Sequence, residues 1–195
     1  MKLISLLILL ALTACKYSTL PGNTKILDAS QDDNLGGTGT DSADVRAMAE
    51  RMAREIAGIN WPKEGVVPRV ALLPLDNQTR FRIDPKLLQN KLVKDLINFS
   101  RGHVAYLARD SEQAVMAERS KKRAGLYDQG NATVAMAGAD YLLKGEMRSL
   151  SKASKQGVSD YVVYSFQLID AESGVILWMG DYETKKMGQT GVIYQ

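Results

Sequence analysis

The sequence predicts an α/β domain (α+β mixed) in which helices flank a mixed sheet of about four to five strands. Two apolar runs of strand length, within residues 66–75 and 103–108, each lie between segments of helical periodicity. Three further segments after residue 138 alternate apolar and polar side chains, which is typical of strands with one solvent-exposed face. We therefore expect one sheet with helices packed on it, in the order α-β-α-β-α-α-β-β-β.

The chain begins with the pattern of a cleavable secretory signal, residues 1–14. Lys2 is followed by an almost unbroken apolar stretch, residues 3–12. This stretch is too short to span a bilayer, which needs about 20 apolar residues. The alternatives are an ordinary secreted protein or a buried N-terminal helix.

The end of this leader holds the only cysteine of the chain. Leu12, Thr13 and Ala14 lead directly into Cys15, and this ending resembles the lipobox of bacterial lipoproteins. The resemblance implies that signal peptidase recognises Leu12–Ala14 and that Cys15 becomes acylated, palmitate included. Lys16 stands where an aspartate would favour inner-membrane retention, so the resemblance implies the outer membrane.

The composition limits the classes of function. Removing residues 1–14 takes away only Lys2, so the 25 Lys+Arg become 24 against 22 Asp+Glu. This near balance does not predict a nucleic-acid-binding protein, which needs a concentrated basic face. With Cys15 lipidated, we expect no disulfide, no cysteine metal site and no cofactor.

The mature chain divides into a tether and one domain. Residues 15–40 are expected to be the lipidated cysteine and a flexible tether, because they contain few clustered apolar residues and include Pro21 and the glycine-rich stretch 36–39. No lysine follows these glycines, so they do not indicate a phosphate-binding loop. Residues 41–195 are expected to form a single globular domain.

The first half of this domain predicts helix, strand and helix. The spacing of Val45, Met48, Met52 and Ile56 predicts a helix from Ser42, capped by Asp41 or Ser42 and ended near Gly58. Residues 66–75 predict a strand buried on both faces, and residues 76–82 a polar loop. Asp84-Pro85 predicts the start of a second helix, whose buried stripe contains Leu88, Leu92, Leu96 and Phe99 and which Gly102 ends.

The second half predicts a strand, helical segments and three strands. A strand is expected over 103–108, followed by a helix that Asp110 or Ser111 caps and that carries the basic run 119–123. This run could bind lipid headgroups, a phosphate-rich polymer or an acidic partner, or be a solvated helix end. A short helical piece is expected over 132–137. On each of the three strands one set of apolar side chains is expected to share a face. The sets are Tyr141, Leu143 and Met147 on the first strand, Val162, Tyr164, Phe166 and Leu168 on the second, and Ile176, Trp178 and Tyr182 on the third.

No catalytic set is apparent in the sequence. The single histidine, His103, begins a strand and is expected to be structural. Carboxylate pairs such as Asp110/Glu112 and Glu172/Asp181 are typical of any protein surface. We therefore expect a binding module and not an enzyme.

Three motifs in order resemble the LpoB-like outer-membrane lipoproteins, which activate penicillin-binding proteins. They are the Asn-x-Thr loop at Asn77–Thr79 after an apolar strand, the Gly-Ala-x-Tyr entry at 138–141, and the hairpin ending Ser173–Trp178. The resemblance covers residues 40–195 and implies a fold related to the N-terminal domain of TolB. It also implies a non-catalytic mechanism: the lipoprotein binds the regulatory domain of a bifunctional class A penicillin-binding protein and shifts it to its active state, so regulating peptidoglycan synthesis and cell shape.

The tether argues for a rival function. About 25 residues span at most ~80–90 Å when fully extended, whereas the enteric activators carry a longer, proline-rich tether. The same fold occurs in CsgG-like and PelC-like lipoproteins, so the alternative is a structural subunit of a periplasmic ring or export assembly at the outer membrane. The sequence does not decide the oligomeric state.

Two sets of residues are candidates for partner binding. The loop after the first strand contains an aromatic side chain flanked by arginines, which is typical of binding hot spots. The solvent-exposed face of the next long strand is the second candidate. The residues are Asn77, Thr79, Arg80, Phe81 and Arg82 in the loop, and Lys144, Glu146 and Arg148 on the strand. For both sets the alternative is an ordinary solvated surface.

Overall fold

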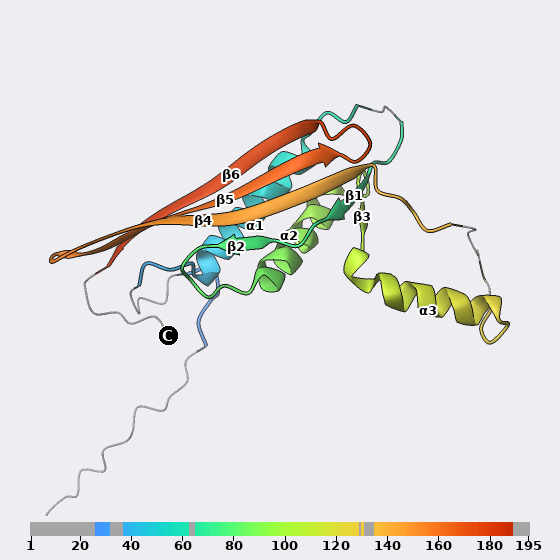
Figure 1. The fold of residues 1–195 in the computed structure, drawn as a ribbon, viewed down its shortest axis with the longest axis horizontal. Helices are drawn as coiled ribbons and strands as arrows, with labels where there is room; N and C mark the ends of the chain where they lie inside the picture. The colour runs from blue at the N-terminus through green and yellow to red at the C-terminus, as the bar shows by residue number, and fades with distance from the viewer. Residues whose placement is uncertain (1–25, 32–36, 63–64, 129, 131–134, 189–195) are drawn as a thin grey trace, which may run out of the picture.

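A computed structural model describes residues 26–31, 37–62, 65–128, 130 and 135–188 (Figure 1). The signal segment, Cys15 and the tail beyond Gly188 lie outside these residues. The described part contains three α-helices, one 3-10 turn and six strands in a single sheet. Their bounds are α1 Ser42–Ala57, β1 Arg69–Leu72, β2 Asp76–Gln78, α2 Pro85–Ser100, β3 Ala105–Leu107, η1 Arg109–Ser111, α3 Glu112–Arg123, β4 Tyr141–Ser154, β5 Gly157–Asp170 and β6 Ile176–Gly188.

The sheet is mixed, which confirms the predicted fold class. Its strand order is β3-β1-β4-β5-β6, and β2 pairs with β4 beside that path. Strand β1 is parallel to both β3 and β4, whereas β4, β5 and β6 form an antiparallel meander of long strands. Helices α1 and α2 lie together on one face of the sheet (Figure 1), so the opposite face carries no helix in the described part of the chain.

The two core helices begin at the predicted caps. Asp41 accepts a hydrogen bond from the backbone N–H of Asp44 at 2.9 Å, and Asp44 accepts one from the N–H of Asp41 at 3.0 Å, which makes a capping box. Asp84 caps α2 before Pro85, whose fixed φ suits the first helical position. The predicted inward stripes are buried, with Met48 and Leu92 at their centres, except that Phe99 is only partly buried.

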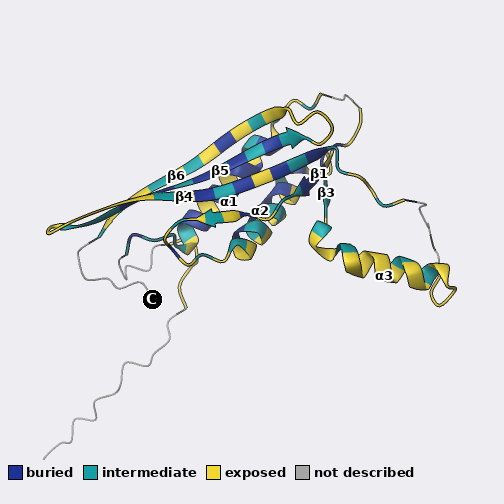
Figure 2. Ribbon diagram, in the orientation of Figure 1, coloured by how far each residue is buried: buried dark blue, intermediate teal, exposed yellow. Residues whose placement is uncertain are grey.

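The hydrophobic core lies between these helices and the meander. Tyr164 and Phe166 of β5 are fully buried, as the alternation of that strand predicted, and exposed and buried residues alternate along the long strands in Figure 2. Gly145 of β4 allows the closest approach: a Cβ there would lie 2.3 Å from Leu75 Cδ2 and 2.6 Å from Phe166 Cε1. The core therefore requires glycine at this position.

The strand predicted over 66–75 is shorter than expected. Only residues 69–72 pair, because Pro68 and Pro74 cannot donate to a ladder. Val70 and Ala71 are both buried, which confirms a strand covered on both faces. The polar loop expected after it begins with a further short strand, β2, which pairs in parallel with β4.

Ile176 does not share a face with Trp178 and Tyr182, contrary to the prediction. A register shift between Leu168 and Ile169 pairs Trp178 with Leu168 on the core face and Ile176 with Ile169 on the other face. Such a bulge reverses the facing of the residues beyond it. Ile176 is exposed as a result.

Helix α3 projects away from the body of the domain (Figure 1), and none of its residues is buried. Asp110 and Ser111, expected as caps, form η1 with Arg109, and Ser111 makes no side-chain cap hydrogen bond. The helical piece predicted over 132–137 is not found at 135–137, and residues 131–134 lie outside the described part.

Candidate partner-binding surface

The loop after β2 is held by the side chain of Asn77. Its amide nitrogen donates to the carbonyl oxygens of Phe81 at 3.0 Å and Ile83 at 3.3 Å. Its amide oxygen accepts from the backbone N–H of Thr79 at 3.0 Å and from the Thr79 hydroxyl at 2.7 Å. Asn77 and Thr79 thus satisfy the loop's own polar groups and give it a fixed shape.

Phe81 is not the exposed aromatic that the sequence suggested. Its exposed fraction is 8%, and it belongs to the hydrophobic core. The hydrogen bonds of Asn77 turn the loop back on the domain, so the ring enters the interior. The guanidinium of Arg80 lies over the ring, with its Cζ 4.6 Å from the ring centroid.

Arg80 binds a buried carboxylate. Its Nε and Nη2 lie 3.0 and 2.5 Å from the two carboxylate oxygens of Asp160 on β5, which is 1% exposed. Ser151 and Thr38 also donate hydroxyl hydrogen bonds to Asp160. Burial alone raises the pKa of Asp160, but the hydrogen bonds from Arg80, Ser151 and Thr38 outweigh it and lower the pKa below its ordinary value.

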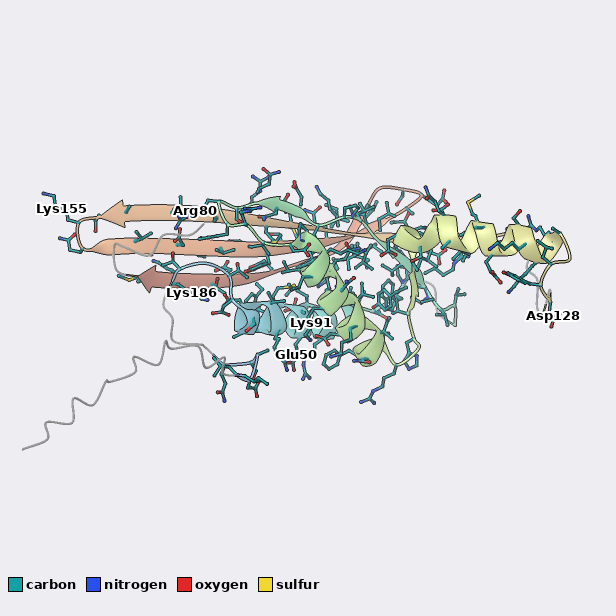
Figure 3. All side chains as sticks on the ribbon, turned by 90° about the horizontal axis from the view of Figure 1, so that it is seen from below. Glu50, Arg80, Lys91, Asp128, Lys155 and Lys186 are labelled. Carbon is teal, nitrogen blue, oxygen red and sulfur yellow. The ribbon has the colours of Figure 1, made fainter. Side chains whose placement is uncertain are left out.

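A second polar cluster fixes the point where the chain enters the domain. Lys186 Nζ lies 2.5 Å from Asp41 and 2.7 Å from Asp44, and it donates to the carbonyl oxygen of Gly39 at 3.2 Å. The hydroxyls of Thr40 and Tyr164 lie 2.5 Å apart. Residues 37–41 are therefore attached to β5 and β6, at the end of the sheet where Figure 3 shows Arg80 and Lys186.

The strand candidates lie on the face of the sheet that the helices leave uncovered. Lys144 and Arg148 are exposed and Glu146 is half-buried, whereas the intervening Met147 points into the core. Arg148 Nε lies 3.1 Å from Glu146 Oε1. Because β2 pairs with β4, the first part of the loop lies directly beside this charged row.

The eight candidate residues thus fall into three groups. Asn77, Thr79 and Phe81 shape the loop or fill the core, and Arg80 holds Asp160. Lys144, Glu146 and Arg148 present a charged strand face. Arg82 is exposed on the other side of the loop, where it lines a groove between α1 and α2.

Sequence reasoning missed the buried carboxylate, although a signal was available. Asp160 occupies an inward position in the alternation of β5, in phase with Val162 and Tyr164. A carboxylate at such a position needs hydrogen-bond donors, which predicts a buried polar cluster. The partners themselves could not be predicted, because Thr38 and Arg80 are distant from Asp160 in the sequence.

Neither a metal site nor a membrane-spanning helix is found among the described residues. No group of three or more His, Cys, Asp or Glu side chains there is placed to hold a metal ion. In that same part of the chain, none of the helices has the length and apolar character needed to cross a membrane.

These features define a mixed α/β domain with two helices on one face of the sheet and an uncovered, charged opposite face. A family model described as the peptidoglycan-synthase activator LpoB matches residues 44–184. The match extends over well more than half of the chain and includes every helix and strand from β1 to β5, so the chain belongs to the LpoB family of peptidoglycan-synthase activators. A comparison with curated proteins finds no match.

Solved structures of low identity resemble the chain. The LpoB C-terminal domain from Salmonella enterica is 17% identical with a TM-score of 0.45, and the alignment covers 72% of this chain and 98% of that one. The LpoB C-terminal domain from Escherichia coli is 18% identical with a TM-score of 0.45, and the alignment covers 72% of this chain and 98% of that one. A PelC dodecamer from Paraburkholderia phytofirmans is 16% identical with a TM-score of 0.33, and the alignment covers 67% of this chain and 80% of that one. At these TM-scores the family assignment rests on the family model.

Proposed function

We propose that this protein binds and activates a bifunctional class A penicillin-binding protein through the regulatory domain of that enzyme, and so controls peptidoglycan synthesis. The observation that supports the proposal is the family match over residues 44–184. Activation needs no chemistry from this chain, because preferential binding to the active conformation of the synthase is sufficient. A tenfold shift of that equilibrium needs about 1.4 kcal/mol of differential binding free energy.

The proposed location is the periplasmic side of the outer membrane. The proposal rests on the leader and on Leu12–Cys15, whose order is that of a lipobox. Lipidation at Cys15 with more than one acyl chain gives stable anchoring, which a single chain does not. Incorporation of labelled palmitate by the full chain, and its loss in Cys15→Ser, is the expected result. Equal labelling of both proteins would remove the anchor from the proposal.

The attachment of residues 37–40 to the sheet limits the proposed tether. At most residues 16–36 can serve as the linker between the lipid and the domain, which is 21 residues. Fully extended, 21 residues span about 70–75 Å. The point at which the chain enters the domain must therefore lie within that distance of the outer membrane, and the domain itself supplies the remaining reach to the synthase.

The exposed members of the candidate set remain proposed contacts. Lys144, Glu146 and Arg148 present alternating charges on the uncovered sheet face, and Arg82 lies on the opposite side of the loop. Charged residues at an interface mainly set the association rate and the choice of partner. We therefore expect charge reversal at a true contact to change the salt dependence of binding.

The test is glycan polymerisation and peptide cross-linking by the organism's own purified class A penicillin-binding proteins, with and without the mature chain. Saturable binding to one synthase and an increased rate are expected. If the chain stimulates no synthase and elutes as a defined multimer from a sizing column, the proposal is refuted and the ring or export subunit is favoured. A heat-denatured sample of the chain controls for carrier effects.

A further inference from the structure

A groove with an apolar floor and a cationic rim lies between the N-terminal parts of α1 and α2. Its volume is about 630 Å³, within the range of pockets that bind small ligands or single anchoring side chains. Val45, Ile83 and Leu87 provide the apolar lining, and Ala29 forms part of one wall. Val45 belongs to the buried stripe of α1 and forms the inner end of the groove, whereas Leu87 lies outside the buried stripe of α2.

Leu87 is the residue that distinguishes the groove from an ordinary helix junction. It is 56% exposed, whereas its neighbour Leu88 is fully buried in the core. Together with Val45 and Ile83 it makes an apolar floor bordered by polar residues, which is the usual composition of a binding pocket. Leu87 therefore offers apolar surface that the described part of the chain leaves uncovered.

The charge around the groove is positive. Arg46, Arg82, Lys91 and Lys94 line it, against the two carboxylates of Asp41 and Asp84. Both carboxylates are already engaged: Asp41 by Lys186 and the α1 cap, and Asp84 by the α2 cap.

The four cations differ in their pairing. Lys91 and Lys94 share Asp95, at 2.5 and 3.8 Å. Arg82 has no carboxylate partner among the described residues. Arg46 faces Asp28, whose pKa is lowered mainly by the hydrogen bonds from Ser30 and least by the charge of Arg46. A carboxylate from outside the domain would meet the same field.

We propose that this groove is the site at which the domain docks on the synthase. The inference rests on the proposed function and assigns the contact to Leu87 and Arg82 on this chain. The partner segment has one apolar side chain, which packs against Leu87, flanked by carboxylates that meet Arg46, Arg82 and Lys94. An apolar anchor surrounded by charged contacts is the usual arrangement of a protein interface.

The double variant Arg82→Glu, Leu87→Gln tests the assignment. Both side chains are exposed, and glutamine is a good helix former, so the thermal melt is expected to match that of the wild type. The control is Leu150→Gln, Lys152→Glu, at exposed positions of β4 outside the candidate set, where Leu150 is 59% exposed. The control makes the same kinds of change, an apolar-to-polar substitution and a charge reversal, away from the groove.

The assay is binding of the mature chain and both variants to the full-length purified class A penicillin-binding protein that the wild type stimulates. We expect at least tenfold weaker binding for the groove variant and less than twofold change for the control. Between 0.05 and 0.3 M salt, the affinity of the wild type should fall more steeply than that of the groove variant.

Three outcomes overturn the assignment in different ways. If the wild type stimulates the synthase and the groove variant binds as tightly, the groove is not the docking site, although the proposed function stands. If the groove variant loses binding to isolated peptidoglycan while it retains the synthase, the groove binds the cell wall. If the wild type binds no class A synthase, the proposed function fails and the assignment fails with it.

Discussion

Replacing Asp160 by asparagine tests the polar cluster that joins the loop, the sheet and the entering chain. The substitution keeps the shape of the side chain but removes the charge that Arg80 binds at 2.5 and 3.0 Å. It also weakens the hydroxyl hydrogen bonds from Thr38, which is buried, and Ser151, which is exposed. The variant should therefore be less stable than the wild type while its fold is retained.

The expected loss can be estimated from these contacts. Removing one partner of a fully buried ion pair costs about 3–5 kcal/mol. The side chain of Arg80 is 43% exposed, so water can solvate its charge in the variant, and the cost is smaller. The Thr38 hydroxyl adds about 1 kcal/mol. We expect the free energy of unfolding to fall by about 2 kcal/mol, or the melting temperature by about 4–8 °C.

The pH dependence provides a second measurement. The folded pKa of Asp160 is below its ordinary value, so its contribution to stability is present above about pH 4 and is lost as the pH falls through the folded pKa. The difference between wild type and Asp160→Asn should be constant from pH 5 to 8 and should shrink below pH 4.

Urea unfolding of the mature chain measures both effects. Asp181→Asn, at an exposed position on β6, is the matched control and should change the free energy by less than about 0.5 kcal/mol. A loss below 0.5 kcal/mol in Asp160→Asn, or a difference that does not change with acid, would refute the assignment of this cluster as a stabilising one.

Three further predictions concern the core and the entering chain. Phe81→Ala should lower the free energy of unfolding by about 3–4 kcal/mol, because the ring is buried, and an unchanged urea midpoint would contradict this. Gly145→Ala should destabilise the domain by about 1–3 kcal/mol, because the added Cβ has no space. The control Gly138→Ala should be nearly neutral, because no atom lies within 4 Å of a Cβ at that position. Equal melting temperatures of the two variants would contradict this prediction. Burial lowers the pKa of Lys186, but hydrogen bonds to Asp41 and Asp44 outweigh it and raise the pKa. Lys186→Met should lower the free energy of unfolding by about 1 kcal/mol at neutral pH, and this loss should diminish above about pH 10.5. A series of thermal melts in which the loss grows at alkaline pH would contradict the pairing.

The loop candidates show how far sequence reasoning extended at the site. The pattern of an aromatic between two arginines predicted an exposed hot spot, yet Phe81 is buried and Arg80 faces Asp160. Composition alone cannot show which side of a loop faces the core. That choice depended on Asn77, whose side chain binds the carbonyl oxygens of Phe81 and Ile83. By contrast, the exposure of Lys144 and Arg148 followed from strand alternation, which is local.

The sequence by itself determined the fold class, the helix caps at Asp41 and Asp84, and the inward faces of β4 and β5. These features depend on spacing and on neighbouring residues, which the sequence contains directly. The features that depend on contacts between residues far apart in the sequence were decided only by the tertiary structure. It placed β2 beside β4, reversed the facing of Ile176 through a bulge, and enclosed Asp160 with Arg80 and Thr38. It also formed the groove at Leu87, because a groove between two helices exists only once both have packed on the same sheet.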